Sequence, residues 1–488
     1  MKSNNIGYVI FLSVVAALGG FLFGYDTAVI SGSISQVTAL YHLDAMQQGW
    51  YVGCALVGSI AGVSVAGLCS DIAGRKKTLL FSAILFSASG FGCAIAQNIG
   101  ELVAFRIIGG VGIGMVSIIS PMYISEIAIS KYRGRLVSSY QLAITIGFLG
   151  AYLVNYELLQ VAAGHPVFSS SMMQKIFVDE VWRAMLGMES IPALLFLVVI
   201  FFIPESPRWL VLRHRSEKAR TILTRIYREP AEADRQLATL APAPVIHSVT
   251  VLAAPGARPA ATGILSGARP AENGQWKILL QPANRKAILV GMAIAILGQF
   301  MGVNAVLYYG PTIFKDSGLS DGDSLLYQVL VGLVNVLTTV LALVIIDKVG
   351  RKKLVYYGVS GMIISLILIG LYFWKGAAAG FSNIFLLCFF LFYIFCCAVS
   401  VCAVVFVLLS EMYPTAIRGV AMSIAGFALW IGTYLIGQLT PWMLDHLTPS
   451  GTFFLFTVMC FPYLWIIWKQ VPETTGKSLE EIEGMWAG

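Results

Sequence analysis

The chain has 488 residues, of which 58% are apolar and 12% are charged, against roughly 25% charged residues in an ordinary soluble protein. Its mean hydropathy is +0.80. This balance excludes a disordered chain, which needs low hydrophobicity, and a multidomain soluble enzyme, which cannot hide apolar runs that recur from end to end. We therefore expect an all-α membrane protein, because each helical span needs roughly 20 apolar residues.

Apolar runs predict twelve transmembrane helices in chain order. Their expected ranges are 8–30, 48–70, 78–97, 102–124, 136–157, 184–203, 286–310, 325–346, 354–374, 383–408, 415–438 and 452–470. The first run is too long for the apolar core of a signal peptide and lacks a small-residue cleavage site, so we expect a retained helix.

One long hydrophilic stretch separates the two sets of helices. The expected parts are an N-terminal six-helix half (1–203), a cytoplasmic linker with short helices (204–285), a C-terminal six-helix half (286–470) and a cytoplasmic tail (471–488). Within the linker, Pro207–Arg235 is basic and compatible with helices. Residues 241–273 are rich in Ala, Pro and Gly and predict a flexible segment.

Lysine and arginine gather on one side of the predicted bundle. The other side carries only Lys175, Arg183, Lys315 and Lys375. Since cytoplasmic loops carry the excess of Lys and Arg, both termini are expected in the cytoplasm. The net charge of +7 is spread in short clusters between apolar runs, which indicates membrane topology and no nucleic-acid partner.

The two halves repeat a charged motif. Gly74-Arg75-Lys76-Lys77 follows the second predicted helix, and Gly350-Arg351-Lys352-Lys353 follows the eighth, 276 residues later. Glu126 with Arg133 recurs as Glu411 with Arg418, 285 residues later. Similar offsets for separate motifs indicate a duplicated six-helix unit, and such repeats with a substrate site between them are typical of rocking transporters.

Acids and arginines at the cytoplasmic helix ends are candidates for a gate. Such pairs would hold the two halves together when the cytoplasmic side is shut, and a network of them can bias two conformations that differ by a few kcal/mol. The basic triplets alone are also explained by topology. The candidate gate residues are Asp71, Arg75, Glu126, Arg133, Glu205, Asp347, Arg351, Glu411 and Arg418.

Other chemistry finds no support in the sequence. The eight cysteines form no CxxC pair and the five histidines are scattered, so we expect no disulfide, no metal site and no cofactor. No nucleotide-binding loop or nucleophile–base pair appears, and we expect that the chain is not an enzyme.

At these motifs the chain resembles the sugar porter branch of the major facilitator superfamily, most of all bacterial xylose–proton symporters and facilitative glucose transporters. The resemblance is carried by Gly24-Tyr25-Asp26-Thr27, Asp71-Ile72-Ala73-Gly74-Arg75-Lys76-Lys77, Arg106-Ile107-Ile108-Gly109-Gly110, Pro121-Met122-Tyr123-Ile124-Ser125-Glu126, Pro204-Glu205-Ser206-Pro207-Arg208-Trp209-Leu210 and Pro472-Glu473-Thr474-Thr475-Gly476-Lys477. It implies the major facilitator fold and a bacterial inner membrane location.

The resemblance also implies a central sugar site. The matching positions are Gln141, Gln299, Asn304, Tyr308, Trp430 and Phe406, where the last stands in place of a family tryptophan. Amides both donate and accept hydrogen bonds, as sugar hydroxyls require. Taken singly, an intrahelical amide is as often a helix–helix contact as a ligand contact.

Four positions depart from the family pattern. Gly298 replaces a glutamine, Leu429 replaces an amide, Phe148 stands where the xylose symporters have glutamine, and Cys402-Ala403-Val404-Val405-Phe406 replaces Gly-Pro-x-x-Trp. Each change removes a hydrogen-bonding group at a cost of about 1 kcal/mol or more. We expect a more apolar pocket and a less interrupted tenth helix.

Asp26 lies well inside an apolar run, where an ionisable residue is a functional candidate. The xylose–proton symporters have aspartate at this position, and the uncoupled carriers have an amide. Arg106 is its expected partner, so that protonation of Asp26 would weaken the pair and free the first helix. The alternative is a static buried ion pair.

The resulting hypothesis is a secondary active transporter that imports a monosaccharide or polyol by proton symport with alternating access. An uncoupled facilitator or a non-sugar porter of the same fold remains an alternative. A sensor is disfavoured because only 18 residues follow the last predicted helix. The expected partners are the sugar or polyol, the proton and the lipid bilayer, and the expected state is a monomer.

Overall fold

The computed structural model describes residues 5–240, 281–376, 379–413 and 418–471. These residues form helices and contain no strand. The described residues form twelve spans that are long and apolar enough to cross a membrane, which agrees with the expected number, and some of these spans consist of two consecutive helices. The helices are α1 (Ile6–Tyr41), α2 (Ala45–Ala73), α3 (Arg75–Ile95), α4 (Ile99–Ile127), α5 (Arg133–Ala163), α6 (Ser171–Gln174), α7 (Trp182–Gly187), α8 (Ser190–Ile200), α9 (Pro207–Leu212), α10 (Ser216–Tyr227), α11 (Pro230–Leu240), α13 (Pro282–Phe300), α14 (Val303–Asp316), α15 (Asp321–Val349), α16 (Arg351–Leu371), α17 (Asn383–Cys397), α18 (Ala403–Met412), α19 (Arg418–His446) and α20 (Thr448–Gln470).

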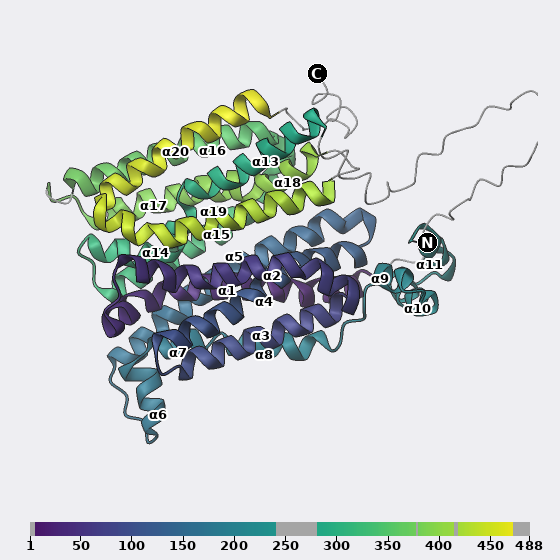
Figure 1. Ribbon diagram of the computed structural model, residues 1–488, viewed down its shortest axis with the longest axis horizontal. Coiled ribbons are helices and arrows are strands. Elements are labelled where there is room, and N and C mark those ends of the chain that lie inside the picture. The colour runs from purple at the N-terminus through teal and green to yellow at the C-terminus, as the bar shows by residue number, and fades with distance from the viewer. Residues whose placement is uncertain (1–4, 241–280, 377–378, 414–417, 472–488) are drawn as a thin grey trace, which may run out of the picture.

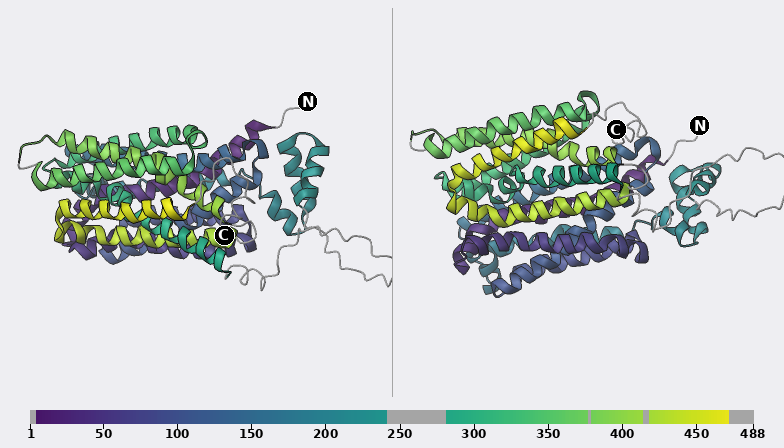
Figure 2. Two further views of the ribbon diagram at one scale, coloured as in Figure 1. Left: turned by 90° about the horizontal axis from the view of Figure 1, so that it is seen from above. Right: turned by 45° about the horizontal axis from the view of Figure 1, so that its top comes forward.

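The spans form two bundles that lie side by side (Figures 1 and 2). The N-terminal bundle contains α1–α8 and the C-terminal bundle contains α13–α20. The short helices α9–α11 lie at one end of the assembly, next to the first residues of α1 (Figure 1). The backbone N–H of Asn5 donates to the carbonyl of Ile226 at the end of α10, which fixes that contact.

The charged repeat has the same local structure in both halves. Gly74 separates α2 from α3 with a φ of 98°, and Gly350 separates α15 from α16 with a φ of 96°. Only glycine adopts such angles without strain. The lysine two residues after each of these glycines makes an equivalent hydrogen bond in each half. Lys76 Nζ donates to the carbonyl of Phe201, and Lys352 Nζ donates to that of Val471, each at 2.9 Å. The structure thus repeats contacts as well as sequence.

Three helices differ from the sequence predictions. The first continues to Tyr41 instead of ending at residue 30, because Ser31 and Ser33 donate to carbonyls within the helix and remain buried. The seventh is broken between α13 and α14 at Gly302, whose φ is 92°. The tenth is interrupted by a π-helical turn at Ala398–Cys402, although the glycine–proline pair of the family is missing. Such turns often mark functional segments.

The helix-compatible stretch of the linker holds α9, α10 and α11. Trp209 of α9 donates through Nε1 to the carbonyl of Asp71 at 2.9 Å, and Arg213 donates to the same carbonyl at 2.7 Å. These bonds attach α9 to the end of α2. The proposed flexible segment, 241–273, and all of the tail after residue 471 lie outside the described residues.

Hydrogen bonds between the two halves occur away from α9–α11. Tyr152 of α5 donates to the carbonyl of Leu307 at 2.8 Å, and Gln438 of α19 donates to that of Met46, at the start of α2, at 2.9 Å. These two bonds join the halves at positions remote from α9–α11.

Candidate functional site

A buried ion pair lies in the middle of the N-terminal half. Asp26 of α1 accepts a hydrogen bond from Arg106 of α4, with 2.8 Å between Oδ1 and Nη1. The side chains are 0% and 2% exposed, so neither charge has access to bulk solvent. The sequence correctly paired these two residues.

Glu189 completes this group, and sequence analysis missed it. It lies at the junction of α7 and α8, is 1% exposed, and interacts electrostatically with both Asp26 and Arg106. The signal was available, since Glu189 stands inside an apolar run where any ionisable residue is a functional candidate. Glu189 was overlooked because it lies only six residues into a predicted helix and belongs to no recognised motif.

The group is incompletely hydrogen-bonded. Asp26 Oδ2, Glu189 Oε1 and Arg106 Nε are buried and have no hydrogen-bond partner among the described residues. Buried polar atoms without partners are costly, at about 1–3 kcal/mol each. One proton placed on a carboxyl oxygen would supply a missing donor between the two acids, whereas full ionisation would leave two carboxylates facing one guanidinium.

A second polar group lies in the C-terminal half, where α13 gives way to α14. Asn304 Nδ2 donates to Gln299 Oε1 at 2.6 Å, and Thr433 of α19 donates to the same oxygen at 3.2 Å. The break at Gly302 brings the end of α13 and the start of α14 together and so aligns the two amides. The side chains of Gln299 and Asn304 are half-buried, whereas that of Asp26 is buried.

Aromatic residues lie at the interface of the two halves. Trp430 of α19 packs on Phe23 of α1, with ring centroids 5.6 Å apart. Tyr308 of α14 is 2% exposed and interacts electrostatically with Asp26 and Arg106, across the interface. Tyr308 therefore connects the charged group with the helix that bears Asn304.

The other positions discussed for the sugar site make no side-chain hydrogen bond to Gln299 or Asn304 among the described residues. Gln141 is half-buried on α5 and makes no hydrogen bond to the described residues. Phe148 is buried against Tyr152, and Leu429 is half-buried and offers only its carbonyl, which Thr433 binds at 2.9 Å. The side chain of Phe406, in α18, lies outside the described part of the chain.

Gly298 leaves open space at a position where the family carries an amide. A Cβ atom there would meet nothing nearer than Val401 at 3.6 Å and Tyr463 at 3.7 Å, which are ordinary contacts. The backbone at residue 298 therefore accepts a Cβ atom without a clash.

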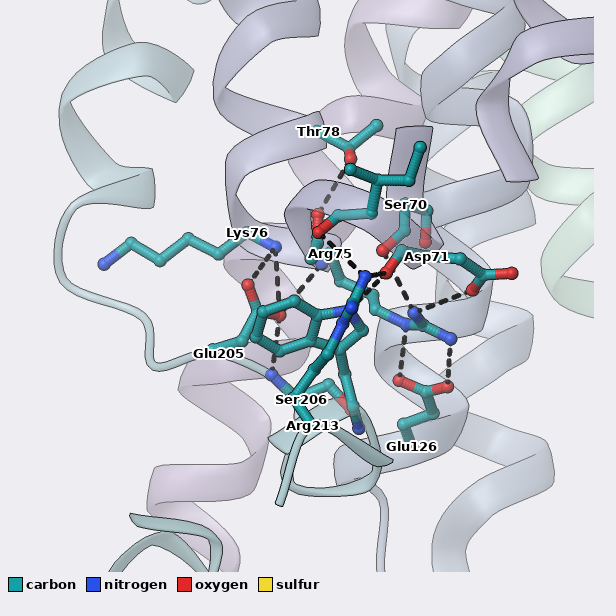
Figure 3. A network of polar contacts seen from close by, with 12 residues as sticks. Ser70, Asp71, Arg75, Lys76, Thr78, Glu126, Glu205, Ser206 and Arg213 are labelled. Atoms are coloured by element: carbon teal, nitrogen blue, oxygen red, sulfur yellow. Dashed lines mark hydrogen bonds and ion pairs between the residues drawn. The ribbon is translucent and has the colours of Figure 1, made fainter. Parts of the chain in front are cut away.

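A compact ionic cluster lies where α2, α3 and α4 meet α9 (Figure 3). Arg75 binds Glu126 through Nε and Nη2, both at 3.1 Å, and Asp71 through Nη1 at 3.2 Å. The side chains of Arg75 and Glu126 are 7% and 6% exposed, while that of Asp71 is 75% exposed. The Arg75–Glu126 pair therefore contributes more to stability than the Arg75–Asp71 pair, because solvent weakens exposed ion pairs.

Glu205 joins this cluster through the backbone. Its carboxylate accepts the N–H groups of Arg75 at 2.9 Å, Ser206 at 2.8 Å and Lys76 at 3.2 Å (Figure 3). Burial raises the pKa of the Glu205 carboxyl, and the three backbone donors and Arg75 oppose that rise. Glu205 thereby caps the start of α3, where the N–H groups have no helical partners.

The remaining candidate gate residues are Arg133 in the N-terminal half and four residues of the C-terminal half. Arg133 is exposed at the start of α5. In the C-terminal half, Arg351 Nη1 donates to the carbonyl of Ile346 at 3.5 Å, as Arg75 does to that of Ser70 at 3.2 Å. The side chains of Asp347, Glu411 and Arg418 lie outside the described residues.

Comparisons with known proteins agree with this architecture. A family model described as sugar (and other) transporter matches residues 12–486. The arabinose-proton symporter of Bacillus subtilis is 36% identical, with 99% of this chain and 96% of the relative covered. The D-xylose-proton symporter of Escherichia coli is also 36% identical, with the same coverage.

Solved structures of the xylose transporter XylE from E. coli resemble the chain as well. Its inward open conformation matches with a TM-score of 0.79 and 33% identity over 98% of this chain and 100% of that one. XylE bound to 6-bromo-6-deoxy-D-glucose matches with a TM-score of 0.74 and 34% identity over 99% and 100%. The higher score belongs to the inward open form, which agrees with the position of the contacts between the halves.

Proposed function

Since the chain belongs to the sugar (and other) transporter family, we propose that it imports a monosaccharide or polyol by proton symport, through alternating access of its two halves. The family consists of multi-pass membrane transporters and not of enzymes. The observation that carries the proposal is the buried group of Asp26, Arg106 and Glu189. We further infer that both termini face the cytoplasm and that the chain acts as a monomer.

The proton is carried by the two buried acids. Arginine keeps its charge in proteins, so the charge of this group changes only at Asp26 or Glu189. With both acids ionised, one guanidinium faces two carboxylates and the group is negative. A single proton makes it neutral, which is the cheaper state away from water. Entry and departure of this proton provide the coupling step.

The substrate is proposed to bind between the halves, on the amides of α13 and α14. Gln299, Asn304 and Thr433 supply the polar contacts, and Trp430 supplies an apolar surface for a sugar ring. A few polar groups in an otherwise apolar cavity are typical of small-molecule sites. The names of the relatives, which include arabinose and xylose symporters, support a monosaccharide.

Tyr308 links the two sites. It lies on α14, four residues after Asn304, and within electrostatic reach of Asp26 and Arg106. A change in protonation alters the field at Tyr308, and a bound sugar fixes the helix that carries it. We infer that proton and sugar bias the same movement of α14 against α1.

The ionic cluster of Arg75, Asp71, Glu126 and Glu205 is proposed as the N-terminal part of the cytoplasmic gate. Its ion pairs lie within one half. In the inward-facing arrangement, the cluster thus keeps its charges paired while the gate is open. We infer that on closure it meets the repeat of the C-terminal half, which contains Arg351 and Glu411.

Uptake by purified protein in proteoliposomes tests the function. Pentoses, hexoses and inositols are offered with and without an inward proton gradient. We expect one class to accumulate only with the gradient. Equal initial rates and no accumulation in both conditions would make the protein a facilitator, and no response to any compound would reject the substrate class.

A further inference from the structure

A groove with a volume of about 610 Å³ opens along the seam between α13 and α20. Its mouth is formed by Arg285 and Lys286, in the first turn of α13, and by Gln470 at the end of α20. These helix ends lie at the same end of the bundle as α9–α11 (Figure 1), the end that the proposed orientation makes cytoplasmic. The groove is lined by none of the residues assigned to sugar, proton or gate.

Below its mouth the groove is apolar and faces outward. Leu289 is 54% exposed and Trp465 is 51% exposed, and both line it with Val290, Ala293 and Ile466. From residue 285 to residue 293 a helix rises about 12 Å. One leaflet of the hydrocarbon core is about 15 Å deep, since the whole core measures about 30 Å. The apolar wall therefore matches most of the depth of one leaflet.

The described residues that line the groove include two basic side chains at its mouth and no acidic one. Arg285 and Lys286 are exposed, and neither forms an ion pair within the part of the chain that the structure describes. The first turn of α13 has no acidic residue, and the start of a helix favours an anion. Exposed Trp468, with Lys469 over its ring at 5.7 Å, marks the membrane interface beside the groove.

We propose that this groove binds one anionic phospholipid of the cytoplasmic leaflet. The lipid phosphate lies between Arg285 and Lys286, and an acyl chain lies on Leu289 and Trp465. Basic pockets between transmembrane helices on the cytoplasmic side are known sites for anionic head groups. A free phosphate ion satisfies the cations but leaves the apolar wall uncovered, whereas a phospholipid satisfies both. The inference is independent of the transport function.

Native mass spectrometry of the full-length protein tests this site. Phosphatidylglycerol and phosphatidylcholine with the same acyl chains are titrated, and the dissociation constant of the first bound lipid is measured. We expect tighter binding of phosphatidylglycerol. In the double variant Arg285→Gln, Lys286→Gln, its dissociation constant should rise about 30-fold, which corresponds to roughly 1 kcal/mol for each basic residue near the membrane surface.

Two further variants separate charge from shape. The double variant Arg215→Gln, Lys218→Gln removes the same charge from exposed positions at the α9–α11 end, outside the groove, and should bind phosphatidylglycerol as wild type does. Ala293→Phe keeps both cations but fills the groove, and should weaken binding of both lipids.

Four results would overturn the proposal. They are equal affinity for the two lipids, an equal loss in the Arg215 and Lys218 control, competition by inorganic phosphate at concentrations equal to the lipid, and unchanged binding in Ala293→Phe. A gain in phosphatidylglycerol affinity on Glu480→Gln, Glu481→Gln would place the chain's own acidic tail in the groove, and would overturn it too.

Discussion

The centres of the two halves differ in their chemistry. The N-terminal half holds charged side chains with almost no exposure, Asp26, Arg106 and Glu189. The C-terminal half holds neutral groups bonded to one another, the half-buried Gln299 and Asn304 and the buried Thr433. A group that must gain and lose a proton needs a site where charge is costly, while a sugar needs neutral donors and acceptors that exchange partners easily. We infer that the duplicated unit has diverged into a proton half and a sugar half.

The largest expected effect comes from removing the buried cation. Arg106→Met leaves Asp26 and Glu189 without their counter-charge, and breaking a buried pair in this way costs roughly 3–5 kcal/mol. We expect a clear loss of thermal stability in purified protein, measured by the melting temperature. Arg106→Lys retains the charge and should lose less. A melting temperature equal to wild type in Arg106→Met would show that the cation does not hold the N-terminal half together.

The next effect concerns Glu189. Its substitution tests whether this acid takes part in proton coupling or has a structural role only. Glu189→Gln keeps the volume of the side chain but removes one of the two proton acceptors. We expect gradient-driven accumulation to fall at least tenfold, because the group then needs no proton to be neutral. Glu157→Gln alters an exposed glutamate of α5 and serves as the matched control. Accumulation at the wild-type level in both variants would limit proton coupling to Asp26.

A smaller effect is expected in the sugar half. Gln299→Ala removes the acceptor shared by Asn304 and Thr433, and we expect substrate affinity to fall about tenfold, since a lost hydrogen bond is worth about 1–1.5 kcal/mol. The pH dependence of binding should stay as in wild type, unlike that of Glu189→Gln. Calorimetric titration measures both. Unchanged affinity in the folded variant would remove Gln299 from the site.

The same half offers a gain-of-function test. Gly298→Gln with Leu429→Gln restores amides where the chain has lost them, and a Cβ atom at residue 298 meets only ordinary contacts. Binding of a common hexose should improve. If it does not, the helices around this position have adapted to another ligand.

The smallest expected effect lies at the gate. Glu126→Gln keeps the size of the side chain but removes a charge that we propose meets the C-terminal repeat on closure, and loss of one such pair shifts a conformational equilibrium by about 1 kcal/mol. We expect several-fold higher labelling of a cysteine engineered into the cytoplasmic cavity. Labelling at the wild-type rate would reduce the cluster to a role in topology and packing.

Hydropathy was sufficient to predict the twelve spans, because few other structures accommodate so many uncharged runs. The ion pair of Asp26 and Arg106 and the repeated glycine–arginine turns were also predictable, since each depends on a local signal. Glu189 was missed because only the folding of α8 against α1 gives it a partner. Trp209 and Arg213 were missed as contacts of Asp71 because the docking of α9 is a tertiary event. The break at Gly302 is likewise set by packing and not by the apolar pattern.

Concentrative uptake by Asp26→Asn tests the central claim most directly. Asparagine keeps the size and much of the hydrogen bonding of Asp26 but carries no titratable proton. The account predicts that the variant binds substrate and exchanges it across the membrane, because exchange needs no net proton movement, yet fails to accumulate it under an imposed inward proton gradient. Accumulation equal to that of wild type would contradict the account and leave Asp26 as a static member of a buried ion pair.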